Sequence, residues 1–543
     1  MLRRSPWLLA LALLVPYPAY AKEAELGPAI EVRAASVADL LVAAKFLGES
    51  LNQGEAVKQG VEFIKSQIDD DKGLDGIDSK RPWGLTATVT PNVIDSPVVL
   101  MIPLADRNSF LGLMKGKLNL DPKKLAGDVY EVKVPNVPVP VFFRFTKDTV
   151  LVTAMNAKSL DAEPSAEFLS AKETSQFVAR LHYDRLPADV KKVVFAQWEL
   201  QANDGMRRAR PNETPAETKL RQWLLEQSLP GIQRVLNDGD TLTVALDLDT
   251  PDAKGEVRLD ARFTARPGSG LAKTIRALEG RPGVALPLPD ARKLFALDAK
   301  IGLPDDAKMS FAPLVDALLA EAVKGAQKDQ QVPLQLVTDA LKPTLQSGEI
   351  DLRLAVTAGP KPGTVEAFGA LATVKGTEVE KLAKFIAGFA PADAVTFAFD
   401  TKTVDGVKLH GVTVKQHDML DRFGTQAVQL GTSDGRFLFA IEGTGKALEA
   451  IATAAPTAGA AVYTNDIALA ALVAAVEKEL PADTVRALYK DAFGVDLGTD
   501  PGAGADNFSL RVTGGVALHA RLVLRGKTVK FLTALDAEKK KDK

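Results

Sequence analysis

A pattern of two strands followed by a helix recurs along the chain, and it constrains the fold more than any other sequence feature. In the clearest copy, apolar residues alternate with polar ones from Leu242 to Leu248 and again from Val257 to Phe263. Strict alternation predicts a hairpin with one apolar and one polar face. The polar face carries Asp247 and Arg258, and a helix over 269–278 is expected to cover the apolar face.

Three further segments repeat this pattern, and they begin at Arg81, Gly348 and Asn507. A short strand and helices precede each copy. Before the first copy, Ser36 and Asp39 have the spacing of a capping box, which predicts a helix that begins there. Four copies of one pattern indicate an internal repeat.

The repeat predicts an α+β fold that is internally duplicated, with antiparallel sheets covered by helices and arranged in two lobes. The copies at Arg81 and Gly348 are followed by a second hairpin and helix, so a long unit plus a short unit occurs twice. The predicted boundaries are a signal peptide at 1–21, a first lobe at 22–289, a second lobe at 290–538 and a frayed, charged tail at 539–543.

The first 21 residues have the composition of a signal peptide. Arginines near the start precede an apolar run from Trp7 to Val15, and a small residue, Ala21, marks the expected cleavage site. The apolar run is too short to cross a bilayer comfortably, and no later segment has about 18 uninterrupted apolar residues. We therefore expect a periplasmic or secreted protein, cleaved after Ala21, with no transmembrane segment in the mature chain.

Charge and cysteine content exclude several functions. The 543 residues include 67 basic and 69 acidic side chains, so no excess of positive charge is available to bind nucleic acid. Cysteine is absent, which excludes disulfides, thiol nucleophiles and thiolate metal sites.

Two short motifs resemble catalytic or nucleotide-binding loops. The stretch "GTSDG" at 431–435 matches the serine hydrolase pattern, but a strand is expected after it instead of a helix, which favours an ordinary turn. The stretch "GTGKAL" at 443–448 lacks the earlier glycine and the hydroxyl of a phosphate-binding loop, since Ala440 and Ala447 stand there. It predicts only the start of a helix.

Metal ligands of the transition-metal type are sparse. The histidines are His182, His410, His417 and His519. The spacing of His410 and His417 puts them on opposite faces of a continuous strand, and His519 alternates with arginines on a polar face that we expect to be solvated. The sequence predicts no catalytic, cofactor-binding or metal-binding residue and no cofactor.

The stretch from Asp69 to Asp78 is rich in aspartate and glycine, which raises the question of calcium binding. The order of acids does not fit a calcium loop in either register: Gly73 replaces a ligand in one, and Leu74 replaces the central glycine in the other. Other copies of the repeat have a polar residue and glycine at the same place. A helix-to-strand connector is therefore the favoured interpretation, and irregular calcium binding from Asp69 to Asp78 stays open.

The segment "GLDGIDSKRPWGL" and the following apolar strand "VVLMIPLADRNSFLGLM" resemble uncharacterised exported bacterial proteins built from repeated α+β modules, of the domain-of-unknown-function type. The specific part of the resemblance covers about 73–114. The later copies lack the Arg-Pro-x-Gly element. The resemblance implies export and a modular fold, and it assigns no catalytic or binding residue.

Two functions remain open from the sequence. The first is a non-enzymatic binding or scaffold protein of the cell envelope, whose partner is an envelope component or an apolar ligand. The alternative is a hydrolase that uses carboxylates from different modules in a cleft between the lobes. The sequence does not determine the oligomeric state, the ligand or the placement of the lobes.

Overall fold

A computed structural model describes residues 27–541 with internal gaps. The gaps are 70–72, 93–94, 136–138, 162–168, 170–173, 209, 211–212, 251–254, 280–281, 289–291, 304, 362–363, 392, 416–419, 421, 459–460, 478, 498 and 500–504. The expected signal peptide with its cleavage site, and also His417, lie outside the described residues.

The described chain divides into two compact units. The first comprises the described residues up to Trp198 together with Gln233–Leu271, and the second comprises Glu199–Ile232 and the described residues from Ala272 onward. Helices and antiparallel strands occur in both. The prediction of a mixed α and β fold with antiparallel sheet pairing is confirmed.

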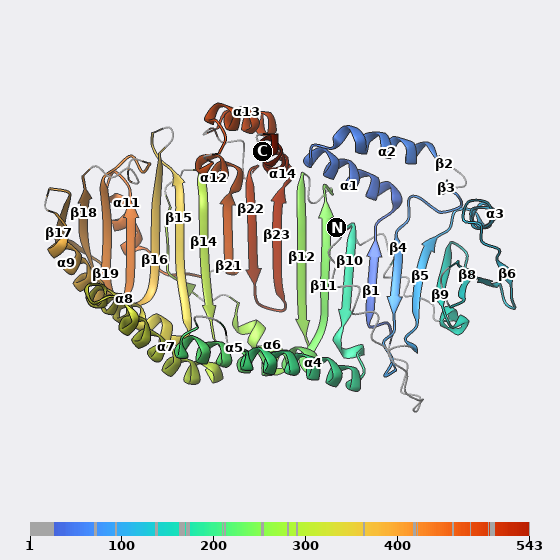
Figure 1. The fold of residues 1–543 in the computed structure, drawn as a ribbon, viewed down its shortest axis with the longest axis horizontal. Coiled ribbons are helices and arrows are strands. Elements are labelled where there is room, and N and C mark those ends of the chain that lie inside the picture. The colour runs from blue at the N-terminus through green and yellow to red at the C-terminus, as the bar shows by residue number, and fades with distance from the viewer. Residues whose placement is uncertain are drawn as a thin grey trace. The chain divides into compact units, whose positions relative to one another are not determined.

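The sheet of the first unit has the strand order β12-β11-β10-β1-β4-β5-β9-β8-β7-β6, and every pairing in it is antiparallel. The strand β1 lies between β10 and β4 (Figure 1). The strands of this unit are β1 Ile30–Ala34, β2 Ile68–Asp69, β3 Gly73–Leu74, β4 Trp83–Ala87, β5 Val98–Pro103, β6 Lys123–Lys124, β7 Val129–Val132, β8 Val141–Phe145, β9 Thr149–Ala154, β10 Phe177–His182, β11 Gly239–Leu248 and β12 Glu256–Ala265.

The helix α1 begins where the sequence predicts it. The hydroxyl of Ser36 accepts a hydrogen bond from the backbone N–H of Asp39 at 3.1 Å, so Ser36 satisfies one of the free donors at the helix start. The helices up to the first unit boundary are α1 Val37–Ser50, α2 Gly54–Ser66, α3 Arg107–Gly112 and α4 Ala188–Arg207. Helices α4, α5 Pro215–Asp238 and α6 Gly270–Ala277 each contain a unit boundary.

The sheet of the second unit has the order β23-β22-β21-β14-β15-β16-β19-β18-β17, again with antiparallel pairings. Here β14 lies between β21 and β15 (Figure 1). The strands are β13 Pro282–Gly283, β14 Lys293–Gly302, β15 Glu349–Ala358, β16 Val365–Lys375, β17 Val395–Val404, β18 Val407–Val414, β19 Ala427–Ile441, β20 Thr457–Ala458, β21 Ala461–Ala468, β22 Asn507–Thr513 and β23 Leu518–Arg525.

The helices of the second unit include one that extends almost to the end of the chain. They are α7 Asp305–Gly325, α8 Lys328–Ser347, α9 Gly376–Phe389, α11 Lys446–Thr453, α12 Leu469–Val476, α13 Ala482–Phe493 and α14 Gly526–Lys541. The expected frayed tail is helical through Lys541, and the Lys539 ammonium lies 2.6 Å from a carboxylate oxygen of Glu477. No helix in the described ranges combines the length and the apolar character that crossing a membrane requires.

The predicted hairpin is present as β11 and β12, followed by the helix α6. Its polar face is not open to solvent throughout, because Asp247 is only 2% exposed and its carboxylate lies 3.0 Å from the Arg258 guanidinium. On the apolar face, Leu259 remains 39% exposed. The helix therefore leaves part of the apolar face uncovered, contrary to the expected covering.

Separate apolar cores stabilise the outer strands of each unit. In the first unit, the rings of Phe110, Tyr130, Phe143 and Phe145 pack against one another, with the Tyr130 and Phe143 rings stacked at 5.0 Å. In the second, Phe368, Leu438 and Ile451 belong to one core, and Tyr489, Phe493 and Phe531 belong to another. These cores hold the strands that position the cavities described below.

Candidate functional site

The aspartate-rich stretch forms a tight connector in the described residues. The backbone of Asp75 and of Gly76 has positive φ, 55° and 90°, as expected for Asp and Gly in such turns. The Asp75 carboxylate pairs with the Lys117 ammonium at 2.7 Å, and the Asp78 carboxylate accepts the N–H of Lys80 at 2.8 Å. The protein itself therefore uses these two carboxylates, while Asp70 and Asp71 lie outside the described residues.

The segment resembling a serine hydrolase motif, 431–435, lies inside the strand β19. Residues 427–432 pair with β18, residues 434–441 pair with β16, and Gly435 at the change of neighbour has φ of 97°. Ser433 thus does not stand on a strand-to-helix turn, and strand residues follow it as predicted.

The segment resembling a phosphate-binding loop starts the helix α11, as predicted. The buried carboxylate of Glu442 accepts hydrogen bonds from the backbone N–H of Thr444 at 2.5 Å and of Ala447 at 3.3 Å. A fixed negative charge therefore occupies the helix N-terminus, where a nucleotide phosphate would have to bind.

One group of potential metal ligands occurs in the second unit: Glu380, Asp400 and His410, whose ligand atoms lie within 4.8 Å of one another. Both ring nitrogens of His410 are already used, since Nδ1 accepts the N–H of Asp400 at 3.1 Å and Nε2 lies 2.9 Å from the Thr432 hydroxyl. The Lys408 ammonium lies 3.3 Å from Glu380 and 3.5 Å from Asp400. This group fits an ion-paired structural cluster better than a metal centre.

A buried polar cluster in the first unit centres on Glu31, which is 7% exposed. Its carboxylate lies 3.3 Å from His182 Nε2, without the geometry of a hydrogen bond, and 3.6 Å from the Arg185 guanidinium. Thr241 contacts the other ring nitrogen of His182 at 3.2 Å. Burial alone would raise the Glu31 pKa, but His182 and the two arginines Arg185 and Arg180 outweigh burial and hold it below its usual value.

This order of hydroxyl, imidazole and carboxylate resembles a nucleophile, base and acid. None of the three residues lines either cavity described below, and two arginines already engage the acid. The cluster therefore stabilises the pairing of β1 with β10 and offers no room for a substrate. Sequence reasoning missed it because Glu31 and His182 meet only through that long-range pairing.

An apolar cavity of about 370 Å³ lies in the first unit between the helix α1 and the strands β1, β4 and β5. Val32 pairs with Leu85, and Leu85 pairs with Leu100, so the three form one row across the strands. The helix contributes Val37 and Leu40. The complete lining is Val32, Ala34, Val37, Leu40, Trp83, Gly84, Leu85 and Leu100.

The apolar surface continues beyond the cavity along the same face of the sheet. Ala34 pairs with Phe177, Phe177 pairs with Leu246, and Leu246 pairs with Leu259, which places the four side chains in a row across β1, β10, β11 and β12. Phe177 is 38% and Leu259 is 39% exposed. Large side chains this exposed in a continuous row form an apolar track that starts at the cavity.

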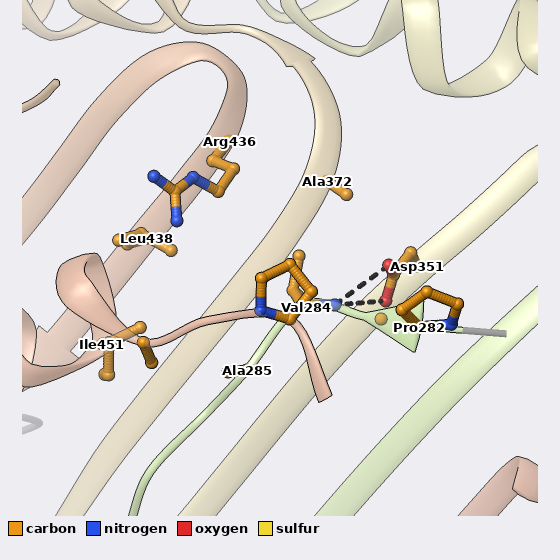
Figure 2. A pocket seen from close by; sticks show the side chains of 11 residues that line it. Pro282, Val284, Ala285, Asp351, Ala372, Arg436, Leu438 and Ile451 are labelled. Carbon is orange, nitrogen blue, oxygen red and sulfur yellow. Dashed lines mark hydrogen bonds between the residues drawn. The ribbon is translucent and has the colours of Figure 1, made fainter. Parts of the chain in front are cut away.

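A second, smaller pocket of about 220 Å³ lies in the second unit. Figure 2 shows Asp351 and Arg436 on opposite sides of it, with Val284 between them in the view. Both carboxylate oxygens of Asp351 accept the backbone N–H of Val284, at 3.2 and 3.0 Å. Burial raises the pKa of Asp351.

Comparison of the chain with protein-family models, with curated proteins and with solved structures finds no match. The suspected likeness to exported bacterial modular proteins therefore stays a prediction.

Proposed function

We propose that this protein is a non-enzymatic binding protein that holds an acyl chain on the apolar face of its first unit. The cavity under α1 carries the proposal, because its volume of about 370 Å³ falls within the usual size of ligand pockets and its lining side chains are all apolar. Burial of apolar surface is the driving force that such a lining offers.

The shape of the apolar surface favours an extended chain over a compact ligand. The cavity opens onto the track from Phe177 to Leu259, which a long flexible hydrocarbon would cover and a small rounded molecule would not. The lining carries no acid, base or nucleophile, which favours binding over hydrolysis at this place.

Export to the periplasm or to the outside of the cell is part of the proposal, and it rests on the signal-peptide composition of residues 1–21. An envelope location would also supply acyl chains as ligands. The absence of cysteine is compatible with an exported protein held together by packing alone.

Internal duplication is also proposed, with the predicted lobes 22–289 and 290–538. In each unit the first sheet strand, β1 or β14, is followed in sequence by two helices and then by its neighbour β4 or β15. Its other neighbour, β10 or β21, comes much later in the sequence. Two separate stretches of chain thus have the same order of pairings, which supports a duplicated plan.

The test uses the purified full-length protein. Solvent extraction and mass spectrometry identify bound lipids, and displacement of a fluorescent fatty acid measures affinity. The variant Ala34→Leu fills the cavity and is expected to weaken binding at least tenfold, which corresponds to about 1.4 kcal/mol. Ala398→Leu, on the exposed side of β17 in the other unit, is the matched control and is expected to bind like the wild type.

Two results would overturn the proposal. One is equal fatty-acid binding by wild type and Ala34→Leu. The other is reproducible hydrolytic turnover that a single carboxylate substitution abolishes, which would favour a hydrolase instead.

A further inference from the structure

The pocket of the second unit is built on a row of three residues in adjacent strands. Ala372 of β16 pairs directly with Arg436 of β19. On its other side Ala372 faces Asp351 of β15, because the preceding pair in this register joins Leu352 and Leu371. Two strand spacings separate the acid from the arginine, roughly 10 Å. The short side chain of Ala372 leaves the space between them open.

Arg436 has hydrogen-bonding capacity to spare. Its guanidinium donates to the carbonyl of Ala452 at 3.3 Å and lies 3.9 Å from the exposed carboxylate of Asp405. A guanidinium has five N–H donors, so most of them remain for a ligand. A planar fork of donors at the edge of an apolar pocket recognises a carboxylate.

Asp351 provides the opposite chemistry. Besides the Val284 N–H, its nearest charged partner is the Lys300 ammonium at 3.8 Å, which is longer than a hydrogen bond. The two carboxylate oxygens can accept further hydrogen bonds. A hydroxyl or amine of a ligand would supply a donor to this half-buried acid.

The wall between the two polar groups is apolar. Leu438 and Ile451 are each 1% exposed and Val284 is 8% exposed, and Pro282 and Pro456 complete this side of the pocket. Figure 2 shows Leu438 and Ile451 on the side of Arg436. A ligand must therefore carry a small apolar body as well as its polar groups.

We infer that this pocket binds a small carboxylic acid with a branched apolar body and a donor group at carbon 2, that is, a 2-amino or 2-hydroxy acid. The carboxylate contacts Arg436, the amine or hydroxyl contacts Asp351, and the apolar body packs against Leu438 and Ile451. This site is independent of the acyl-chain cavity in the first unit. The pocket is smaller than the common ligand cavities, which suits a ligand of this size.

The test compares three matched probes by isothermal titration calorimetry with the full-length protein: leucine, 2-hydroxy-4-methylpentanoate and 4-methylpentanoate. The third probe lacks the donor at carbon 2. Leucine or the hydroxy acid is expected to bind in the millimolar range or tighter, and at least roughly fivefold more tightly than 4-methylpentanoate. The stronger of the first two identifies the donor.

Two variants separate the roles of the polar groups. Arg436→Gln is expected to weaken all probes roughly tenfold, because the carboxylate loses its partner. Asp351→Asn is expected to remove the advantage of the donor-bearing probes while 4-methylpentanoate binds as before. Arg486→Gln and Asp483→Asn alter an exposed ion pair in the same unit and are the matched controls.

Urea denaturation of each variant checks that it is folded. Equal binding of all three probes by the wild type, no binding of any probe at millimolar concentration, or equal loss in the control variants would each overturn the inference.

Discussion

The ammonium of Lys117 lies 2.8 Å from one carboxylate oxygen of Asp75 and 2.7 Å from the other. A lysine thus occupies the position from which a cation would bind this carboxylate. Because the Asp78 carboxylate accepts a backbone N–H in its own turn, the described part of the aspartate-rich stretch is bound up in structural contacts.

Calcium is therefore expected to leave the stability of the protein unchanged. A ligand that binds only the folded state raises the melting temperature, so thermal denaturation with calcium and with a chelator tests this directly. Equal melting temperatures are expected. A rise of several degrees with calcium that Asp75→Asn abolishes would restore the metal interpretation.

Gly76→Ala is expected to destabilise the protein more than Gly127→Ala. Both glycines have positive φ, so both substitutions strain the backbone by about 1 kcal/mol. A Cβ at Gly76 would also lie 2.3 Å from the backbone nitrogen of Phe110, whereas nothing lies within 4 Å of one at Gly127. Urea unfolding of the two variants measures the difference, and equal losses would contradict the close approach.

Ser36→Ala is expected to lower the free energy of unfolding by about 1 kcal/mol, because the helix α1 loses its N-terminal cap. Ser36→Thr keeps a hydroxyl at the same place and is expected to stay close to the wild type. Chemical denaturation checks both variants. A loss in Ser36→Thr as large as in Ser36→Ala would show that the cap is not the cause.

Stability is expected to fall as the pH drops below 6.5, in part because of His410. Burial lowers the His410 pKa in the folded protein, so between 6.5 and that lower value the unfolded chain takes up a proton that the folded protein does not. This contribution is complete above 6.5 and is lost as the pH falls through the folded pKa. In His410→Gln the slope of unfolding free energy against pH over this range is expected to be shallower, and an unchanged slope would contradict the assignment.

Local features of the fold were predictable from the sequence, because they depend on neighbours in the chain. The cap at Ser36, the hairpin of β11 and β12 and the helix start at Lys446 follow from residue order and turn chemistry alone. The buried state of Asp247 was not predictable in this way, since alternation shows that a face is polar without showing what covers it.

The candidate sites depend on contacts that residue order does not reveal. The apolar cavity needs Val32 and Leu85 side by side, and the second pocket needs Asp351 and Arg436 on strands separated by β16. Each of these residues looked like an ordinary strand position. The register between distant strands, which decides what faces what, is fixed by the whole sheet.

The pairing of β14 with β21 has a kinetic consequence. One edge of β14 can be satisfied soon after β15 is synthesised, but the other edge has no partner until residues 461–468 have been made. Loop closure over such a length is slow, so the nascent chain spends time with an open strand edge that could pair with another chain. Folding yield is thus most exposed to aggregation before the last hairpins are complete, and a chain truncated before Ala461 would keep that edge open permanently.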